Sequence, residues 1–217
     1  MQQKMFLNAA RISLFLFAIL FISLPAAVSY ARIAAADAQA FVLELGEQGV
    51  KILQQTSHPA GQNIEQREAH FRAILENKFD LDFISRFVLG RYWRQATVDQ
   101  RDEYQSLFFE FILRTYAARL SSYAGQNFAV ENAVEAGAND VIVRSLISGG
   151  AGPPLRADWR VRDADGVPHI IDVSVEGISM SITQREEFAS VVQREGVEGL
   201  LKILRARTLG LPAEGPT

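Results

Sequence analysis

The sequence predicts an α+β domain in which helices pack on one face of a roughly four-stranded antiparallel sheet. Two observations lead to this prediction. Apolar residues recur at helical intervals up to about residue 124 and again after residue 183, whereas the segment between them alternates apolar and polar residues. With 217 residues, of which 48% are hydrophobic and 22% charged, the chain can bury the core of one domain.

The N-terminus has the pattern of a secretory signal peptide. Lys4 and Arg11 precede an apolar run over residues 12–24, and small residues follow up to Ala31. The run is shorter than the ~20 residues that a membrane-spanning helix needs, which disfavours a permanent anchor. We expect cleavage after Ala31, with residues 34–36 as an alternative site. The mature chain, 32–217, would be a single domain with a short flexible C-terminal tail.

Charge and cysteine content exclude several classes of protein. The formal net charge is −3, and removal of residues 1–31 takes away Lys4 and Arg11 but no acidic residue. A chain this acidic is a poor general binder of nucleic acid. The sequence has no cysteine, which excludes disulfides, thiol catalysis and lipid attachment through cysteine.

Three helices are expected before residue 91. Residues 40–56 carry apolar side chains at helical spacing, and the segment SHPAGQN then breaks the pattern. A second helix should begin near Ile64, with Phe71, Leu75 and Phe79 on its apolar side. The segment DLDFISRFVL predicts a third, short helix that ends at Gly90.

The stretch FVLGRYWRQATVDQRDEYQSLF, residues 87–108, mixes aromatic rings with arginines. Thr97 and Gln100 form a capping box, so a helix should start at Val98 and run to about Ala124. Its aromatic and aliphatic residues recur every three or four positions, and its arginines fall mostly on the other side. A nucleic-acid interface would need both on one exposed face. The pattern favours an inward-facing apolar wall, although an ordinary filled core is equally consistent with any single ring.

Four strands are predicted from the change to a two-residue period. They are NFAVENAV, VIVRSLIS, LRADWRVRD and the segment HIIDVSVEGISM, with turn residues between them. Trp159 and Val161 share one face, and Ile171, Val173 and Val175 should share the same dry face. After the sheet, Thr183 and Glu186 predict the start of a helix that breaks near Gly196.

A search for catalytic motifs finds none. The three histidines, His58, His70 and His169, lack metal-ligand spacing, and the sequence has no nucleophile elbow, phosphate-binding loop or dinucleotide fingerprint. Asp172 and Glu176 are expected on the solvated face of their strand or in salt bridges with Arg160 or Arg162. We therefore expect no cofactor, no metal and no enzymatic activity.

Two long blocks of the sequence carry a resemblance to a known family. Residues 87–126 and 172–201, which include LGRYWR, the aromatic helix, VEGISM and GVEGLL, resemble the MlaC-type, or toluene-tolerance, periplasmic lipid-binding proteins. The resemblance extends from about Phe71 to Arg207. It implies a cavity between sheet and helices that takes phospholipid acyl chains. It also implies a carrier that moves lipid between an outer-membrane lipoprotein complex and an inner-membrane ABC transporter complex.

The residues that suit such a cavity come from the aromatic helix, the block before it and the dry strand faces. They are Phe87, Val88, Tyr92, Phe108, Phe111, Ile112, Tyr116, Val143, Trp159, Val161, Ile171, Val173, Val175 and Ile178. Arg91 and Arg94 precede the helix cap and are candidates for contact with a lipid headgroup or an acidic partner, although a solvated helix end is an equally good interpretation.

Three alternatives stay open. The segments ISRFVLGRYWR and TQREEFASVV are similar to a sister branch linked to hopanoid biosynthesis, called HpnM, which would change the lipid but not the class of protein. A cone-shaped, isomerase-like enzyme would use Asp158 or Asp172 with Tyr116 on an apolar substrate. A scaffold with a filled core would bind no lipid.

Overall fold

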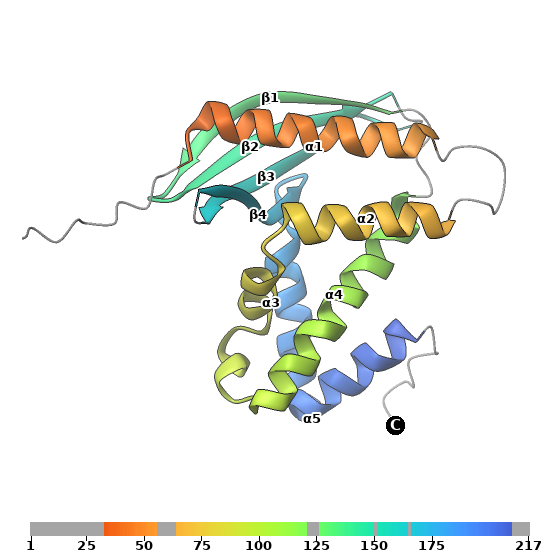
Figure 1. Cartoon of the computed structure of the whole chain (residues 1–217). Coiled ribbons are helices and arrows are strands. Elements are labelled where there is room, and N and C mark those ends of the chain that lie inside the picture. Colours follow the sequence, from red (N-terminus) through yellow and green to blue (C-terminus); the bar gives the residue numbers. More distant parts are fainter. Residues whose placement is uncertain (1–32, 56–63, 121–125, 150–151, 165, 210–217) are drawn as a thin grey trace, which may run out of the picture. The chain divides into compact units, whose positions relative to one another are not determined.

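The computed structural model describes residues 33–55, 64–120, 126–149, 152–164 and 166–209. The predicted signal peptide, the C-terminal tail after residue 209 and the predicted helix end at 124–125 lie outside this part of the chain. The elements, in chain order, are the following (Figure 1): α1 (Ala35–Gln55), α2 (Ile64–Lys78), α3 (Leu81–Leu89), the 3-10 helix η1 (Gly90–Arg94), α4 (Val98–Leu120), β1 (Asn127–Ala136), β2 (Asp140–Ser148), β3 (Leu155–Ala164), β4 (Val167–Val175), β5 (Ile178–Ser179) and α5 (Met180–Thr208).

The strands form one sheet in the order β1-β2-β3-β4-β5, and every neighbouring pair is antiparallel. This confirms the α+β class and adds a two-residue fifth strand to the four that were predicted. The alternation in β3 also holds, since Ala157 and Val161 are buried while Arg156 and Arg160 are exposed. The sheet therefore has one dry face, against which helices pack.

Helix α1 covers the β1–β2 side of the sheet (Figure 1). Buried α1 residues such as Val42 and Leu45 belong to the same apolar cluster as Val143 and Val161. The close approach depends on Gly46, because a methyl group there would collide with the ring of Phe128 on β1. This half of the sheet is filled with protein side chains.

A second apolar cluster holds α3, α4 and α5 together. Tyr104, Phe108 and Phe188 contact one another through their rings, with centroids 5.7–6.3 Å apart. Leu200 and Leu204 of α5 are fully buried in the same cluster. The two clusters meet at the junction of α2 and α3, where Phe79 packs against both.

Helix α4 begins as predicted. The backbone N–H of Gln100 donates to Thr97 Oγ1 (3.2 Å), and Gln100 Oε1 accepts from the Thr97 backbone N–H (3.1 Å). The capping box therefore satisfies two amides that the first turn of a helix leaves without partners. Helix α3 is capped in a similar way, by Asp80 accepting from the N–H of Phe83 (2.8 Å).

Helix α5 begins earlier than predicted. Ser179, and not Thr183, is the N-cap, because Ser179 Oγ accepts from the N–H of Ile182 (3.1 Å). The Thr183 hydroxyl instead donates to the Ser179 carbonyl oxygen (2.9 Å). The predicted break is confirmed at Gly196, whose φ of 72° and ψ of 179° are not helical.

Strand β4 contains an irregularity that the sequence did not reveal. The register with β3 shifts between Arg160 and Val161, so that Asp172 pairs with Arg160 while Ile170 pairs with Val161. Ile171 is the extra residue of this bulge, and the simple alternation is lost there. Among the described residues, no helix combines the length and apolar character needed to cross a bilayer.

Candidate functional site

A cavity of about 330 Å³ lies between the helices and the part of the sheet that α1 does not fill. Its wall is mainly apolar and comes from α2, α3, α4, the start of α5 and strands β2, β3 and β4. Seven of the predicted wall residues line it, and they are Val88, Phe108, Ile112, Tyr116, Trp159, Val173 and Val175.

The helical part of the wall follows from simple spacing. Phe108, Ile112 and Tyr116 are each four residues apart on α4, so they form one row along the helix. From α2, Phe71 and Leu75 add a second row with the same spacing. These two belong to the apolar side of α2 that the sequence showed, but only the fold reveals that this side faces a cavity.

Trp159 forms the sheet side of the wall, and buried polar contacts hold its indole ring. Trp159 Nε1 donates to Ser145 Oγ (2.9 Å), and the Ser145 hydroxyl donates to the carbonyl oxygen of Ala157 (2.9 Å). Ser145 is fully buried, and the ring of Phe128 packs edge-on against the indole at 6.2 Å. Sequence reasoning missed Ser145, because a hydroxyl inside an apolar alternation gives no sign of its partner.

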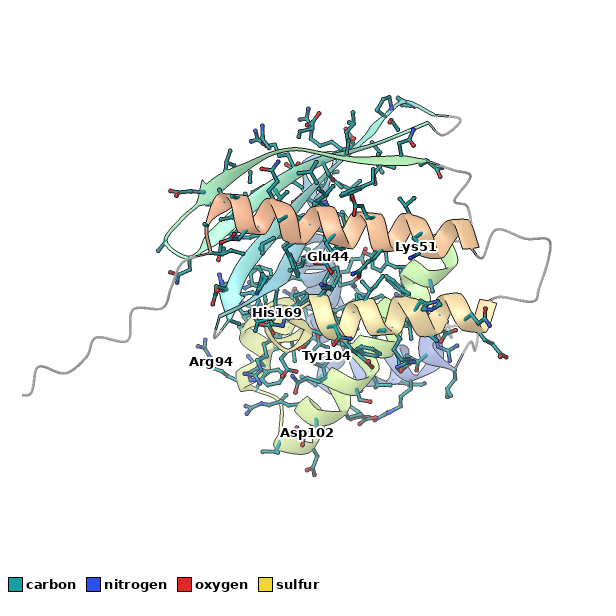
Figure 2. All side chains as sticks on the ribbon, turned by 45° about the horizontal axis from the view of Figure 1, so that its top comes forward. Glu44, Lys51, Arg94, Asp102, Tyr104 and His169 are labelled. Atoms are coloured by element: carbon teal, nitrogen blue, oxygen red, sulfur yellow. The ribbon has the colours of Figure 1, made fainter. Side chains whose placement is uncertain are left out.

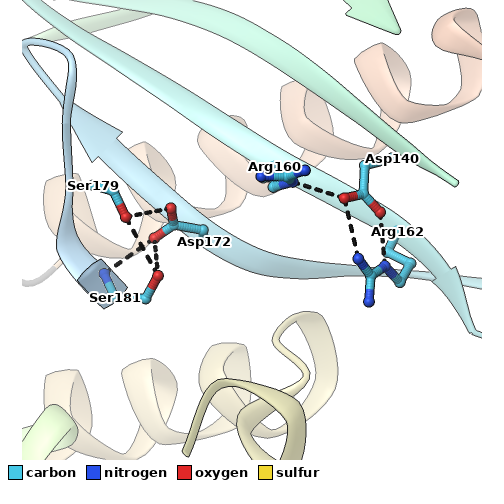
Figure 3. A network of polar contacts seen from close by, with 6 residues as sticks. All are labelled: Asp140, Arg160, Arg162, Asp172, Ser179 and Ser181. Atoms are coloured by element: carbon cyan, nitrogen blue, oxygen red, sulfur yellow. Dashed lines mark hydrogen bonds and ion pairs between the residues drawn. The ribbon is translucent and has the colours of Figure 1, made fainter. Parts of the chain in front are cut away.

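One corner of the wall is polar, at the junction of β4, β5 and α5 (Figure 3). The Asp172 carboxylate accepts from Ser179 Oγ (2.6 Å), from the Ser181 backbone N–H (3.1 Å) and from Ser181 Oγ (2.8 Å). Asp172, Ser181 and Gln184 all line the cavity. The prediction that Asp172 is solvated or paired with an arginine is wrong, because Arg160 and Arg162 pair with Asp140 instead.

Val143 and Val161 do not line this cavity. Both are fully buried in the cluster under α1, where the helix takes the space that the sequence interpretation left for a ligand. The alternation predicts which face is dry, but it does not distinguish a face covered by a helix from a face that borders a cavity.

Phe87, Tyr92 and Phe111 also lie outside this cavity wall. Tyr92 and Phe111 are buried in the cluster of α3, α4 and α5, and Phe87 packs against that cluster. The reason is that these helices pack against one another. The apolar side of α4 therefore lies partly in a filled core and partly at the cavity.

The two remaining predicted wall residues lie on or beyond β4. Ile171 is buried at the bulge but does not line this cavity, and Ile178, on β5, is 60% exposed. Ile178 belongs to a strand of only two residues at the edge of the sheet, where its side chain faces solvent.

Arg91 and Arg94 lie on η1 and are exposed; Figure 2 labels Arg94. The Arg91 guanidinium stacks on the Tyr92 ring, 4.9 Å from its centroid, and donates to the Tyr92 hydroxyl (2.8 Å). This hydrogen bond is the main cause that lowers the pKa of Tyr92. Neither arginine lines the cavity, and both side chains are exposed outside it.

No metal centre is found in the part of the chain that the structure describes, because no three histidine or acidic side chains gather there. The two carboxylates considered for an enzyme, each as a partner of Tyr116, differ in their position relative to the cavity. Asp158 does not line the cavity, whereas Asp172 and Tyr116 do.

The comparisons with known proteins agree on one family. A sequence model described as MlaC protein matches residues 44–206. The intermembrane phospholipid transport system binding protein MlaC of Haemophilus influenzae is 26% identical over 146 residues, which cover 64% of this chain and 68% of that protein. The toluene tolerance protein ttg2D of Pseudomonas putida is 27% identical over 124 residues, or 57% of this chain and 58% of that protein.

A solved structure has a similar fold. It is the phospholipid-binding protein from Ralstonia solanacearum in complex with a phospholipid, and it aligns with a TM-score of 0.71 and 27% sequence identity. The alignment covers 80% of this chain and 97% of that one.

Proposed function

The chain belongs to the MlaC protein family, and from this premise we propose that it is a phospholipid-binding transport protein whose cavity encloses acyl chains. The observation that carries the proposal is the cavity itself, about 330 Å³ with a mainly apolar wall. Each acyl methylene group buried there contributes about 0.8 kcal/mol, so a long chain offsets the cost of association. The Ralstonia relative, which has a similar fold, is in complex with a phospholipid.

Within that function, the protein acts as the periplasmic carrier between an inner-membrane ABC transporter complex and an outer-membrane lipoprotein complex. The name of the Haemophilus relative, a binding protein of an intermembrane transport system, supports this route. The apolar N-terminal segment, residues 12–24 after Lys4 and Arg11, supports export. Release requires a partner that favours the empty state, since a ligand leaves only when another state binds it better.

The lipid is a phospholipid or, as the segments ISRFVLGRYWR and TQREEFASVV favour, a hopanoid-type lipid. An isomerase-like enzyme is the weaker alternative. It would need a carboxylate free to take a proton, and the Asp172 carboxylate already accepts hydrogen bonds from Ser179 and Ser181. A stoichiometric lipid in the purified protein would favour the carrier, and turnover of an apolar substrate would favour the enzyme.

Replacement of Val173 by tryptophan tests whether the cavity is where lipid binds. Val173 lines the cavity, so the indole would occupy space that an acyl chain needs. Because part of its surroundings is open, the substitution should cost less than the ~1–3 kcal/mol typical of overpacking a filled core. We expect Val173→Trp to fold and to carry much less co-purified lipid than the parent. Thermal unfolding and lipid extraction on the same samples measure both effects.

Val143→Trp is the matched control. Val143 is fully buried under α1, so the same enlargement must displace packed side chains. We expect clear destabilisation of this variant. If Val173→Trp keeps its full load of lipid, the cavity is not the binding site, and if the parent carries none, the proposed function itself is wrong.

A further inference from the structure

The polar corner of the cavity carries a negatively charged side chain in a wall whose other described residues are uncharged. Among the described residues that line it, Asp172 is the only one with a carboxylate, and none is a lysine, arginine or histidine. The other polar members, such as Ser181 and Gln184, are neutral. The described part of the wall thus presents one negative charge and no positive charge.

Arg160 and Arg162 of β3 pair with another carboxylate. Arg160 is the cross-strand neighbour of Asp172, yet Arg160 Nε donates to Asp140 Oδ2 (2.7 Å). Arg162 also pairs with Asp140 (2.7 Å), and Figure 3 shows the two groups as separate networks. Asp172 is held by hydrogen bonds from two serines and forms no ion pair within the described part of the chain.

Asp172 also occupies a place where an anion would otherwise bind. The N-terminus of a helix attracts anions, because its first N–H groups have no partners within the helix. At the start of α5 the N–H of Ser181 already donates to Asp172, and that of Ile182 donates to Ser179 Oγ. A ligand phosphate or carboxylate in the cavity would find these donors taken and a like charge beside them.

We propose that Asp172 is a specificity residue that makes the cavity reject anionic groups, so that it takes uncharged or cationic parts of a lipid. The inference rests on the proposed function, because it concerns which amphiphiles the same cavity accepts. At the effective dielectric constant of about 20 that suits protein sites, like charges about 10 Å apart weaken binding roughly tenfold. An ammonium group at the same place is attracted by a similar factor.

Three ligands with the same chain test the proposal: decylamine, decanol and decanoate. Their affinities are measured by displacement of the uncharged dye Nile red at neutral pH. We expect the parent protein to bind decylamine about a hundredfold more tightly than decanoate, with decanol between them. In Asp172→Asn the ratio of amine to carboxylate affinity should fall below about threefold, with little change for decanol.

Glu131→Gln is the control, since it removes the same charge from an exposed position on β1. It should leave the ratio unchanged. Gln184→Lys provides a second variant that keeps the Asp172 hydrogen bonds and adds a cation to the wall, so it should strengthen decanoate binding even if Asp172→Asn does not fold.

Two results overturn the inference and leave the carrier function intact. One is equal affinity of the parent protein for decylamine and decanoate. The other is an unchanged ratio in a folded Asp172→Asn protein or, if that variant does not fold, an unchanged ratio in Gln184→Lys. Failure of the parent to bind all three ligands would instead contradict the proposed function, on which the inference rests.

Discussion

Asp140 is a buried carboxylate that forms ion pairs with two arginines of the neighbouring strand. Its side chain is 4% exposed and accepts hydrogen bonds from Arg160 and Arg162 of β3, each at 2.7 Å (Figure 3). The Arg162 guanidinium also stacks on the ring of Phe83, which joins the sheet to α3. Burial by itself would raise the pKa of Asp140, but the hydrogen bonds from the two arginines together outweigh it, so the pKa is lowered from 3.8.

This lowered pKa predicts how stability depends on pH. Above 3.8, Asp140 is ionised in the folded and the unfolded protein, and its contribution to the free energy of unfolding is complete. As the pH falls through the folded pKa, the unfolded chain takes up the proton more readily and the contribution is lost. We expect the stability difference between the parent and Asp140→Asn to be constant near neutral pH and to shrink below about pH 4. Urea unfolding at several pH values measures it, and a difference that stays constant down to about pH 2.5 would contradict the account.

At the scale of the element, two glycines of α1 have opposite roles. Gly46 faces the Phe128 ring, and a methyl group there would collide with it. Gly49, three residues later, has open space around the position that a methyl group would take. The contact between α1 and β1 therefore depends on one glycine and not on the other.

The pair gives a matched prediction for helix packing. Gly46→Ala should lower the free energy of unfolding by about 1–3 kcal/mol, because the ring must move or the helix must shift. Gly49→Ala should raise it by about 0.5–1 kcal/mol, because alanine is the better helix former. Chemical denaturation of the two variants provides the measurement. Equal effects of the two substitutions would mean that α1 does not pack on β1 as described.

Elements governed by local chemistry were predictable from the sequence. The capping box of Thr97 and Gln100 identified the first residue of α4, because cap hydrogen bonds involve neighbours in the chain. The start of α5 was missed, since Ser179 and Thr183 are both good caps and only the fold, through Asp172, selects Ser179. The bulge at Ile171 gave no signal, because two adjacent isoleucines fit either register.

The candidate site was predictable only in part, for a tertiary reason. Periodicity showed that Val143, Trp159 and Val173 are inward-facing, but α1 covers the first and leaves the other two at the cavity. Which helix covers which part of a dry face depends on contacts between distant segments. The polar partners Ser145 and Asp172 were hidden for the same reason, since their hydrogen bonds join neighbouring strands or β4 with α5.

On the scale of the whole molecule, the dry face of one sheet serves two purposes. The β1–β2 side carries α1 and is largely filled, whereas the cavity is lined by β3, β4 and the end of β2 together with α2, α3, α4 and the start of α5. A filled part supplies stability and an open part leaves room for a ligand. This division is what the proposed carrier function requires, because the protein must stay folded after the lipid leaves.

The proposed docking to partner complexes also belongs to the scale of the whole molecule. Arg91 and Arg94 are exposed on η1 and outside the cavity, so a change of their charge should mainly alter association, although Arg91 also contacts the buried Tyr92. We expect Arg91→Glu/Arg94→Glu to slow the transfer of labelled phospholipid to the partner complexes, with only a small fall in melting temperature from the loss of the Arg91–Tyr92 contact. The matched control is Arg144→Glu/Arg156→Glu, at exposed arginines of β2 and β3. Unaltered transfer, or equal slowing in the control, would remove Arg91 and Arg94 from the docking surface.

Whether the protein carries a lipid in the cell can be measured by native mass spectrometry of protein isolated without detergent from its own cells. We expect a complex heavier than the chain by the mass of a phospholipid or hopanoid-type lipid, at about one lipid per protein. Extraction and fragmentation of the released molecule then identify its headgroup and chains. A spectrum with only the mass of the empty chain, and an extract without lipid, would contradict the proposed carrier function.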